Sequence, residues 1–480
     1  MNIYSEPIAI TGDEGFELTK LQTLLSKSDI QLFWNDQPWL YHQILSLIAG
    51  DDQNSAVVLR AFSTLCSVAI ALLGAKYASG KLRLPAVILF GAIFLFSPWT
   101  FTLSVAAMTE IPAWALALSA LAFQRFNSSR LGRATVVITA ALFSASLHFK
   151  FSTVLILPCI LTEIFISCRQ GQIFQNQSRV KAVRSIGLFC ITSVVVFGLL
   201  IYVAPNFNFS WILGTHVDSL RSEYSLASQA RSLSLGAIST FFWMFCGALL
   251  CIMLGFEKGI RRRSFPPIVL LITVLIVHSL VRPWWYYYSL HWAIACGLVI
   301  TSILTGDNES PEYHQQRGTP TNSYTDSFKK PSTRYIGTVI GVACCLSAHI
   351  VDGFDTLENQ YFNILNRDRV STSPLLASII KYNHKSRWMY TSQRDYSFYS
   401  GVQIPPEIRW LSIKRFISGQ ISSPKVLNIV ASYHPEQLLL TSKEADALNW
   451  SNIVTNYDVV LRTSSSVHFV LKGTSKNPGF

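Results

Sequence analysis

Residues 185–204, SIGLFCITSVVVFGLLIYVA, form a run of 20 residues without a charged side chain. A helix needs about 20 consecutive apolar residues to cross roughly 30 Å of hydrocarbon, so this run predicts a membrane-spanning helix. Similar apolar segments recur at residues 56–74, 84–104, 110–124, 134–149, 150–168, 236–255, 265–281, 285–304 and 335–351. We therefore predict a mostly α-helical polytopic membrane bundle of about ten spans.

The composition agrees with a membrane protein. The 480 residues are 50% hydrophobic and 14% charged, with a mean hydropathy of +0.34, whereas soluble domains carry about 25% charged residues. The net charge of +12 would suit a nucleic-acid partner. However, the basic residues form short clusters between apolar segments, as the positive-inside rule predicts. We therefore expect no nucleic-acid partner.

Basic residues occupy every second loop, which fixes the expected orientation. The clusters are Lys76, Lys81 and Arg83; Arg125, Arg130 and Arg133; Arg169, Arg179, Lys181 and Arg184; Lys258 and Arg261–Arg263; and Arg317, Lys329, Lys330 and Arg334. These loops are predicted to be cytoplasmic in a plasma (inner) membrane, which places both chain ends on the extracytoplasmic side. A chain that starts outside normally needs a preceding span, so we expect a first helix to be missing, or residues 1–12 to be its remnant.

Three parts follow from this pattern. Residues 1–55 form an outer segment with interfacial helices and an acidic motif, residues 56–351 the transmembrane bundle, and residues 352–480 an extracytoplasmic α/β domain. In the tail we predict strands at 425–430, 437–440, 458–461 and 467–471, and helices near 406–419 and 442–449. All nine cysteines lie in or at the ends of apolar segments, and no CxxC or Cys/His metal spacing occurs. We read them as buried thiols.

The outer segment contains the acidic pair Asp13-Glu14, within TGDEGFEL at residues 11–18. Carboxylates are costly inside lipid, so acids kept beside a membrane bundle suggest chemistry at its surface. Thr11 and Glu14 also fit a capping box that opens a helix over about 13–27, in which case Glu14 is structural and Asp13 is free for chemistry. A second helix is predicted to begin near Pro38, and Asp36 either contributes to a site or caps this helix.

Other polar residues lie at the ends of apolar segments. Glu110 is predicted one turn into a helix N-terminus, where the dipole favours an acid regardless of function. Lys150 lies between two adjoining apolar segments, which is costly unless it faces water or a partner. Arg282 beside WWYYY at 284–288 is either a site residue or a snorkelling arginine in an aromatic belt. His278 is expected to be a hydrogen-bonded core histidine.

Several of these stretches resemble polytopic lipid-sugar-dependent glycosyltransferases of the GT-C superfamily. In particular, they resemble bacterial protein-mannosyltransferase and aminoarabinose-transferase-like (family 39-type) proteins. Asp13-Glu14 resembles their first-outer-loop acidic motif, and DQPWLY at 36–41 resembles their Asp-Gln-Pro-Pro-Leu-Tyr turn, with Trp39 replacing the second proline. The resemblance also covers AMTEIPA at 107–113, HFKFS at 148–152, and DYSFYSG at 395–401 with IPPE at 404–407.

The resemblance implies transfer of a sugar from a polyprenyl-phosphate donor to a hydroxyl of a lipid, glycan or protein acceptor. Asp13 would be the general base, with Glu14 and Glu110 as the other catalytic acids. Lys150 or Arg282 would stabilise the departing phosphate. The remaining substrate-binding candidates are Asp36, His148, Tyr287 and His291. No cofactor is implied, and a divalent metal requirement is left open.

Two other classes remain as alternatives. A transporter or flippase of a lipid-linked substrate would suit broken spans near Pro98 and Pro112, but no internal repeat with matching halves is visible. A non-catalytic membrane scaffold would bind a partner through its tail. Substitution of Asp13 distinguishes an enzyme from a scaffold, because an enzyme needs this carboxylate and a scaffold does not.

Overall fold

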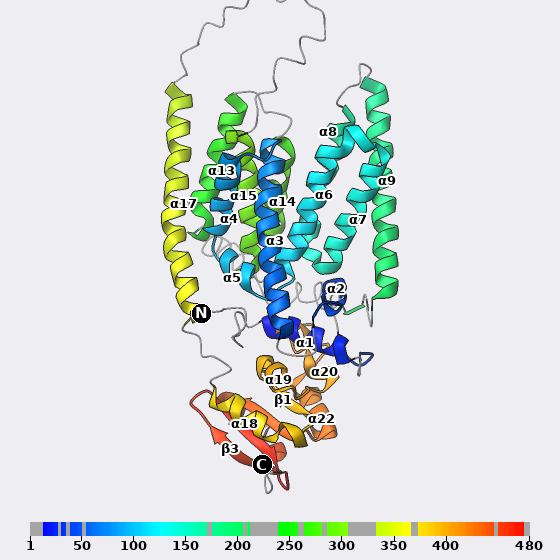
Figure 1. The fold of residues 1–480 in the computed structure, drawn as a ribbon, viewed down its shortest axis with the longest axis vertical. Coiled ribbons are helices and arrows are strands. Elements are labelled where there is room, and N and C mark those ends of the chain that lie inside the picture. The colour runs from blue at the N-terminus through cyan, green and yellow to red at the C-terminus, as the bar shows by residue number, and fades with distance from the viewer. Residues whose placement is uncertain are drawn as a thin grey trace, which may run out of the picture.

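The computed structural model describes residues 13–26, 30–34, 39–49, 54–169, 175–204, 208, 210–211, 239–257, 264–280, 286–305, 333–365, 373–445 and 450–474. They form two parts stacked along the long axis of the molecule (Figure 1). One part is a bundle of long helices, and the other is a small unit around a four-stranded sheet. The predicted class, a helical membrane bundle with a small C-terminal α/β unit, is confirmed.

Helices occupy all ten of the predicted apolar segments. The bundle helices are α3 (Asn54–Ser79), α4 (Leu84–Leu95), α5 (Thr100–Val105), α6 (Glu110–Leu131), α7 (Arg133–Phe149), α8 (Leu157–Arg169), α9 (Gln175–Val203), α13 (Ser239–Glu257), α14 (Phe265–Leu280), α15 (Ser289–Thr305) and α17 (Thr333–Leu365). Two short 3-10 turns, η1 (Phe151–Ile156) and η5 (Tyr286–Tyr288), precede α8 and α15. Helix α17 continues past residue 351, where the sequence placed the end of the bundle.

Five described segments are long and apolar enough to cross a membrane: Ser55–Ser79, Phe151–Cys168, Arg179–Val203, Tyr286–Thr305 and Ile336–Leu365. Four shorter apolar helices accompany them, at Leu84–Leu95, Arg133–Phe149, Phe241–Gly255 and Phe265–Ser279. Helix α15 lies inside the bundle, with its apolar side chains buried by neighbouring helices. Helices α9 and α17 lie at opposite edges (Figure 1), and α9 exposes Ile191, Val194 and Leu199. Such apolar edges are expected where a helix faces lipid.

The predicted span at 84–104 is broken. Helix α4 ends at Leu95, and α5 begins after Trp99, a non-glycine residue with a positive φ of 64°. Helix α17 passes closely here, because a Cβ atom on Gly353 would lie 2.4 Å from the Cβ of Phe96. Glycine at position 353 therefore permits this contact between α17 and the break.

The small unit contains a sheet in the order β1-β2-β4-β3. Strand β1 (Met389–Thr391) pairs parallel with β2 (Gln437–Thr441), while β4 (Ser466–Leu471) runs antiparallel to β2 and to β3 (Tyr457–Arg462). The three predicted strands at 437–440, 458–461 and 467–471 are confirmed. Around the sheet lie the helices α18 (Pro374–Tyr382), α19 (Arg394–Ser400), α20 (Pro406–Arg409), α21 (Ile413–Ile417), α22 (Ser423–Tyr433), α23 (Ser442–Ala445) and α24 (Ser451–Val454).

The strand predicted at 425–430 is wrong, because these residues belong to α22. The Ser422 hydroxyl caps this helix by accepting a hydrogen bond from the amide of Lys425, and proline occupies the first turn. Val426 and Val430, four residues apart, bury the same face. The helix predicted near 406–419 is two short helices, and residues 446–449 of the other lie outside the described part of the chain.

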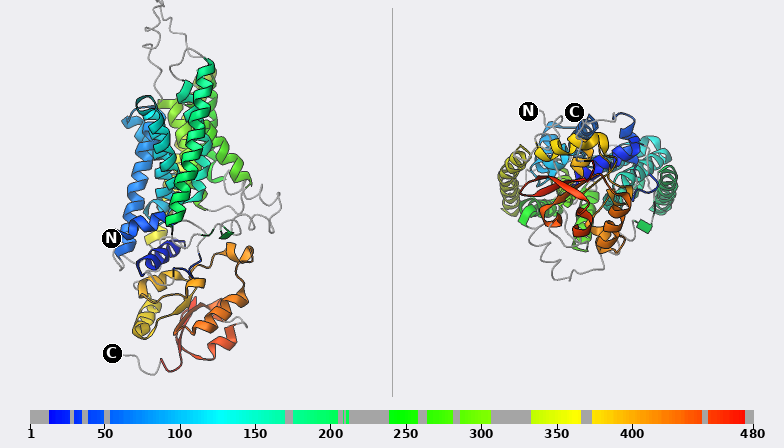
Figure 2. Two further views of the ribbon diagram at one scale, coloured as in Figure 1. Left: turned by 90° about the vertical axis from the view of Figure 1, so that its right-hand side faces the viewer. Right: turned by 90° about the horizontal axis from the view of Figure 1, so that it is seen from below.

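Helices α1 (Glu14–Ser26) and α2 (Leu40–Ser46) lie between the two parts (Figure 2). The helix predicted over 13–27 is confirmed, and the second begins at Leu40, two residues beyond Pro38. Helix α1 also binds the small unit: Lys20 Nζ lies 3.8 Å from the Trp410 ring centroid, and an Arg409 guanidinium nitrogen donates to the Thr23 hydroxyl at 2.6 Å. The second half of α1 is thereby held against the small unit.

Candidate functional site

The candidate site lies where the start of α1 meets the bundle. Asp13 immediately precedes α1, and its side chain is partly exposed. The Tyr286 hydroxyl from η5 donates a hydrogen bond to Asp13 Oδ2 at 3.0 Å. The Tyr286 ring in turn packs against Trp99, with ring centroids 5.0 Å apart. Trp99 is 45% exposed, so a carboxylate and an accessible aromatic ring are linked through one tyrosine.

A buried ion pair lies in the same region. Lys150 Nζ is 2.6 Å from Glu110 Oε1, with the glutamate fully buried and the lysine side chain 13% exposed. Lys150 lies between α7 and η1 and has an extended backbone conformation. Its ammonium lies 5.2 Å from the Tyr287 ring centroid. The charges of Glu110, Glu17 and Asp13 all act on Lys150. The structure therefore brings together four sequence candidates: Asp13, Glu110, Lys150 and Tyr287.

Glu110 is the first residue of α6 rather than one turn inside it. Its position at the N-terminus agrees with the favourable helix dipole. The ion pair with Lys150 adds a second role, because a carboxylate with no exposed surface needs a charged or hydrogen-bonding partner.

A second polar cluster was not predicted from the sequence. His42 Nε2 lies 2.9 Å from Glu17 Oε2, and Lys20 Nζ lies 3.6 Å from the same oxygen. Burial alone raises the pKa of Glu17, but Lys20 and His42 together lower it by more, so that the pKa is about 2. Burial lowers the pKa of His42 below its usual value. Glu17, Lys20 and His42 thus form a buried cluster in which the charge of Lys20 lies close to the Glu17 carboxylate.

Glu14 binds the helical bundle through its carboxylate. Arg60 of α3 donates to both of its carboxylate oxygens, at 2.8 and 2.9 Å, and the Ala107 amide donates to Oε1 at 2.8 Å. A capping-box glutamate stands at the third helical position, whereas Glu14 is the first residue of α1. Thr11 lies outside the described residues. Glu14 and Arg60 are both fully buried, so this pair ties α1 to α3.

The structure places the histidine candidates in other contacts. The Nε2 atom of His148 lies 3.0 Å from the carbonyl oxygen of Phe197 in α9. His291 Nδ1 lies 3.0 Å from His278 Nε2, and the His291 ring packs against Trp114 at 5.1 Å. His278 is thus the hydrogen-bonded buried histidine that its sequence context predicts. Asp36 and Arg282, the other two candidates, lie outside the described residues.

The arrangement provides distinct chemical groups within a small region. Asp13 offers a partly exposed carboxylate, Lys150 a cation, and Trp99 an aromatic face. An ammonium group has three N–H donors, so the ion pair with Glu110 leaves donors of Lys150 for an anionic ligand. Among the described residues, no group of three or more His, Cys, Asp or Glu side chains is arranged to hold a metal ion.

Comparison with known proteins identifies the fold. No protein-family model matches the chain, and no curated protein matches its sequence. The structure of ArnT from Cupriavidus metallidurans in the apo state is 13% identical, with a TM-score of 0.62 over 99% of this chain and 96% of that chain. The structure of the same protein bound to undecaprenyl phosphate is 12% identical and has a TM-score of 0.61. That alignment covers 98% of this chain and 96% of that chain. The chain therefore shares the overall fold of ArnT over nearly its whole length.

Proposed function

We propose that this chain is a membrane glycosyltransferase that moves a hexose or pentose from a polyprenyl-phosphate donor to an acceptor hydroxyl. The observation that carries the proposal is the partly exposed Asp13 carboxylate beside the buried Glu110–Lys150 ion pair, at the junction of the two parts of the molecule. The shared fold with ArnT, whose structure binds undecaprenyl phosphate, supports the same class of donor.

In the proposed reaction, Asp13 accepts the proton of the acceptor hydroxyl as its oxygen bonds to the anomeric carbon of the sugar. The bond between that carbon and the phosphate oxygen breaks, and the lipid phosphate leaves with the bonding electrons. Tyr286 holds the Asp13 carboxylate through its 3.0 Å hydrogen bond. A hydroxyl donor at one carboxylate oxygen leaves the other oxygen for the acceptor proton.

Lys150 is proposed to stabilise the negative charge that develops on the leaving phosphate. Glu110 positions the ammonium through the 2.6 Å ion pair. Because both side chains are largely withdrawn from water, their electrostatic interactions are stronger than those of surface charges. Arg282 remains a second candidate for the phosphate, and Trp99 offers a surface on which a sugar ring can stack.

We place the site and the small unit on the extracytoplasmic face of the membrane. The described basic clusters support this orientation, since Lys76, Lys81 and Arg83 lie at the end of the bundle remote from the small unit. The acceptor and donor would then meet outside the cytoplasm. A flippase, the alternative class, would move the lipid across the membrane without forming a new glycosidic bond.

The experiment uses membranes containing the full chain and a polyprenyl-phosphate sugar labelled in the sugar. We expect label to pass to an endogenous lipid, glycan or protein fraction, and Asp13→Asn to abolish most of this transfer. Asp352→Asn, which removes an exposed carboxylate on α17, is the matched control. Label that crosses the membrane while remaining on its carrier would instead support a flippase. Absence of both movements with full folding would favour a scaffold.

A further inference from the structure

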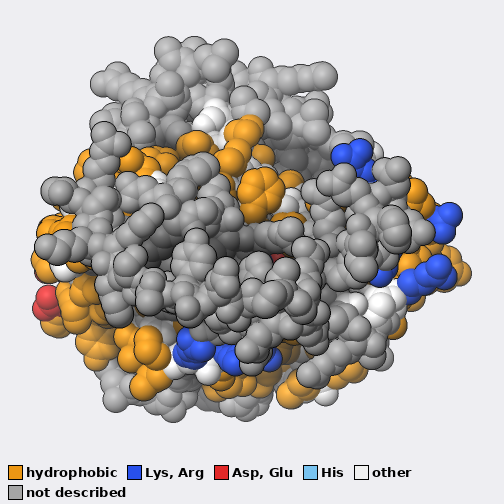
Figure 3. All heavy atoms as spheres, turned by 90° about the horizontal axis from the view of Figure 1, so that it is seen from above, with side chains coloured by type: hydrophobic (Ala, Val, Ile, Leu, Met, Phe, Trp, Pro, Cys, Tyr) orange, Lys and Arg blue, Asp and Glu red, His pale blue; other side chains and the backbone are white. Residues whose placement is uncertain are grey.

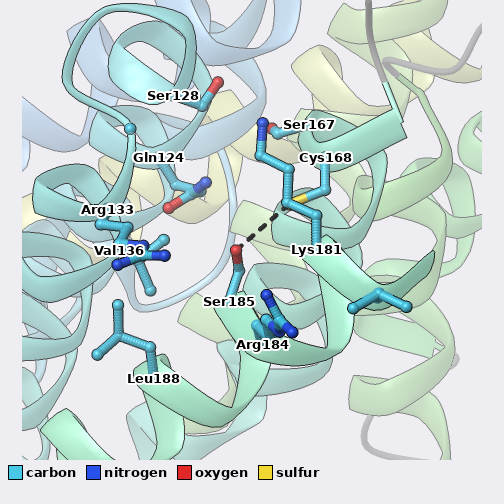
Figure 4. Close-up of a pocket in the computed structure, with 12 residues that line it drawn as sticks. Gln124, Ser128, Arg133, Val136, Ser167, Cys168, Lys181, Arg184, Ser185 and Leu188 are labelled. Atoms are coloured by element: carbon cyan, nitrogen blue, oxygen red, sulfur yellow. Dashed lines mark hydrogen bonds between the residues drawn. The ribbon is translucent and has the colours of Figure 1, made fainter. Parts of the chain in front are cut away.

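A cavity of about 770 Å³ lies at the end of the bundle remote from Asp13, among α6, α7, α8 and α9 (Figure 4). Its lining residues are Gln124, Ser128, Gly132, Arg133, Val136, Ser167, Cys168, Val180, Lys181, Arg184, Ser185 and Leu188. Arg133 begins α7 and Lys150 follows its end, so the 17-residue helix separates the cavity from the candidate site by about 25 Å. The cavity is therefore distinct from that site.

Positive charge around this cavity has no nearby compensation in the sequence. Arg133, Lys181 and Arg184 line it, yet Glu163 is the single carboxylate anywhere between residues 111 and 217. Glu163 is already engaged, because Arg125 donates to it at 2.8 Å and the Tyr77 hydroxyl donates at 2.7 Å. Figure 3 views the molecule from this end, and described Lys and Arg side chains lie at the right of that face and in a second group at its lower centre. An anionic ligand would supply the missing negative charge.

The lining also indicates what kind of anion fits. Ser128, Ser167 and Ser185 also line the cavity, and hydroxyls together with ammonium and guanidinium donors suit a phosphate group (Figure 4). Val136, Val180 and Leu188 make the rest of the lining apolar. A free inorganic anion would gain nothing from these apolar side chains, whereas a lipid would cover them.

The edge of the bundle provides a path for acyl chains. Helix α9 carries Lys181 and Arg184 at the cavity, and further along it exposes Ile191, Val194 and Val195. A lipid with its phosphate at the cations would lay its chains on this apolar surface. Basic pockets between transmembrane helices on the positively charged side of a bundle are suited to such head groups.

We propose that this cavity binds the phosphate head group of an anionic membrane phospholipid in the leaflet at the basic end of the bundle. The lipid bridges α7, through Arg133, to α9, through Arg184, and so fastens the edge helix to the bundle. This site does not depend on the proposed glycosyl transfer, because it lies at the opposite end of the molecule.

The test is retention of lipid by the purified full chain, measured by native mass spectrometry in nanodiscs made with phosphatidylglycerol or with phosphatidylcholine. We expect preferential retention of phosphatidylglycerol. The variant Arg133→Gln/Arg184→Gln should bind it roughly 10- to 30-fold more weakly, since each cation near a lipid head group contributes about one kcal/mol. The control Lys81→Gln/Arg83→Gln removes the same charge at the same end outside the cavity and should bind normally.

A third variant, Arg133→Lys/Arg184→Lys, keeps both charges and should retain most of the binding, which separates charge loss from misfolding. Equal loss of lipid in the cavity variant and in its control would overturn the proposal. Displacement of phosphatidylglycerol by millimolar inorganic phosphate alone would overturn the lipid source and assign the cavity to a soluble phosphate. Retention of phosphatidylcholine as strong as that of phosphatidylglycerol would show that the cations do not select the ligand.

Discussion

Substitutions of the adjacent carboxylates Asp13 and Glu14 are expected to have different effects: the first should lower activity and the second should lower stability. Asp13 is partly exposed and receives one described hydrogen bond, from Tyr286. Asp13→Asn keeps the shape and an oxygen acceptor, so the free energy of unfolding should change by less than about 0.5 kcal/mol. The same change removes the proposed general base, and we expect glycosyl transfer to fall by about 100-fold or more.

Glu14→Gln should instead act on stability. The glutamate has no exposed surface and accepts from Arg60 twice and from Ala107 once. Removing one partner of a buried ion pair typically costs about 3–5 kcal/mol, because the other charge is left without compensation. The glutamine oxygen still accepts from one donor, so we expect a loss toward the lower end, about 3 kcal/mol. The rate per folded molecule should fall less than in Asp13→Asn.

The two effects are measured by thermal unfolding of the purified protein in detergent and by sugar transfer normalised to folded protein. The double variant Glu14→Gln/Arg60→Met tests the cause, because it removes the stranded cation and should recover part of the stability. A Glu14→Gln protein as stable as the original chain would refute the ion-pair reasoning. Full activity of Asp13→Asn would refute the proposed base.

Three further predictions follow from the described contacts. Lys150→Met should weaken binding of undecaprenyl phosphate at least tenfold, measured by direct binding, and unchanged binding would move the phosphate site elsewhere. Because the pKa of His42 is lowered in the folded protein, the unfolded state binds more protons below the usual value of 6.5, and His42 should lower the free energy of unfolding with decreasing pH by up to about 1.4 kcal/mol per unit. His42→Gln should reduce the slope between pH 6.5 and 5 in thermal unfolding, while the slope from His468, whose pKa burial lowers to about 4, remains. The slope from Glu17, with its pKa of about 2, appears only below about pH 4.5. A membrane-impermeant thiol reagent added outside should label Ser442→Cys and not Lys81→Cys in a background without exposed native cysteines; the reverse pattern would invert the orientation.

The spans were predictable because lipid imposes one strong rule, a long apolar segment for each crossing. The break between α4 and α5 was harder to place, since the sequence FSPWT at 96–100 shows a proline but not the positive φ of Trp99. In the small unit, the run at 425–430 has the valine-rich composition of a strand. The hydrogen bond that caps the helix at Ser422 and the four-residue spacing of the buried Val426 and Val430 favour a helix instead.

The site was partly predictable from the cost of charge in lipid. That cost identified Lys150, which lies between two apolar segments and pairs with Glu110. The same rule applied to Arg60, inside the predicted span at 56–74, would have signalled a buried acidic partner. The cluster of Glu17, Lys20 and His42 offered a weaker signal, because acids and bases at these spacings also occur on exposed helices.

The choice between Asp13 and Glu14 illustrates what a local pattern leaves open. Asp13 precedes α1 and Glu14 is its first residue, and the structure turns the two carboxylates toward different partners, Tyr286 and Arg60. Which one turns into the bundle depends on Arg60, which lies 46 residues later in the chain and meets Glu14 only after α1 packs on α3. Arg60 and the Ala107 amide hold Glu14 inside the bundle, and the adjacent Asp13 is the partly exposed carboxylate beside Tyr286. The structural acid thus holds the start of the helix that the proposed base immediately precedes.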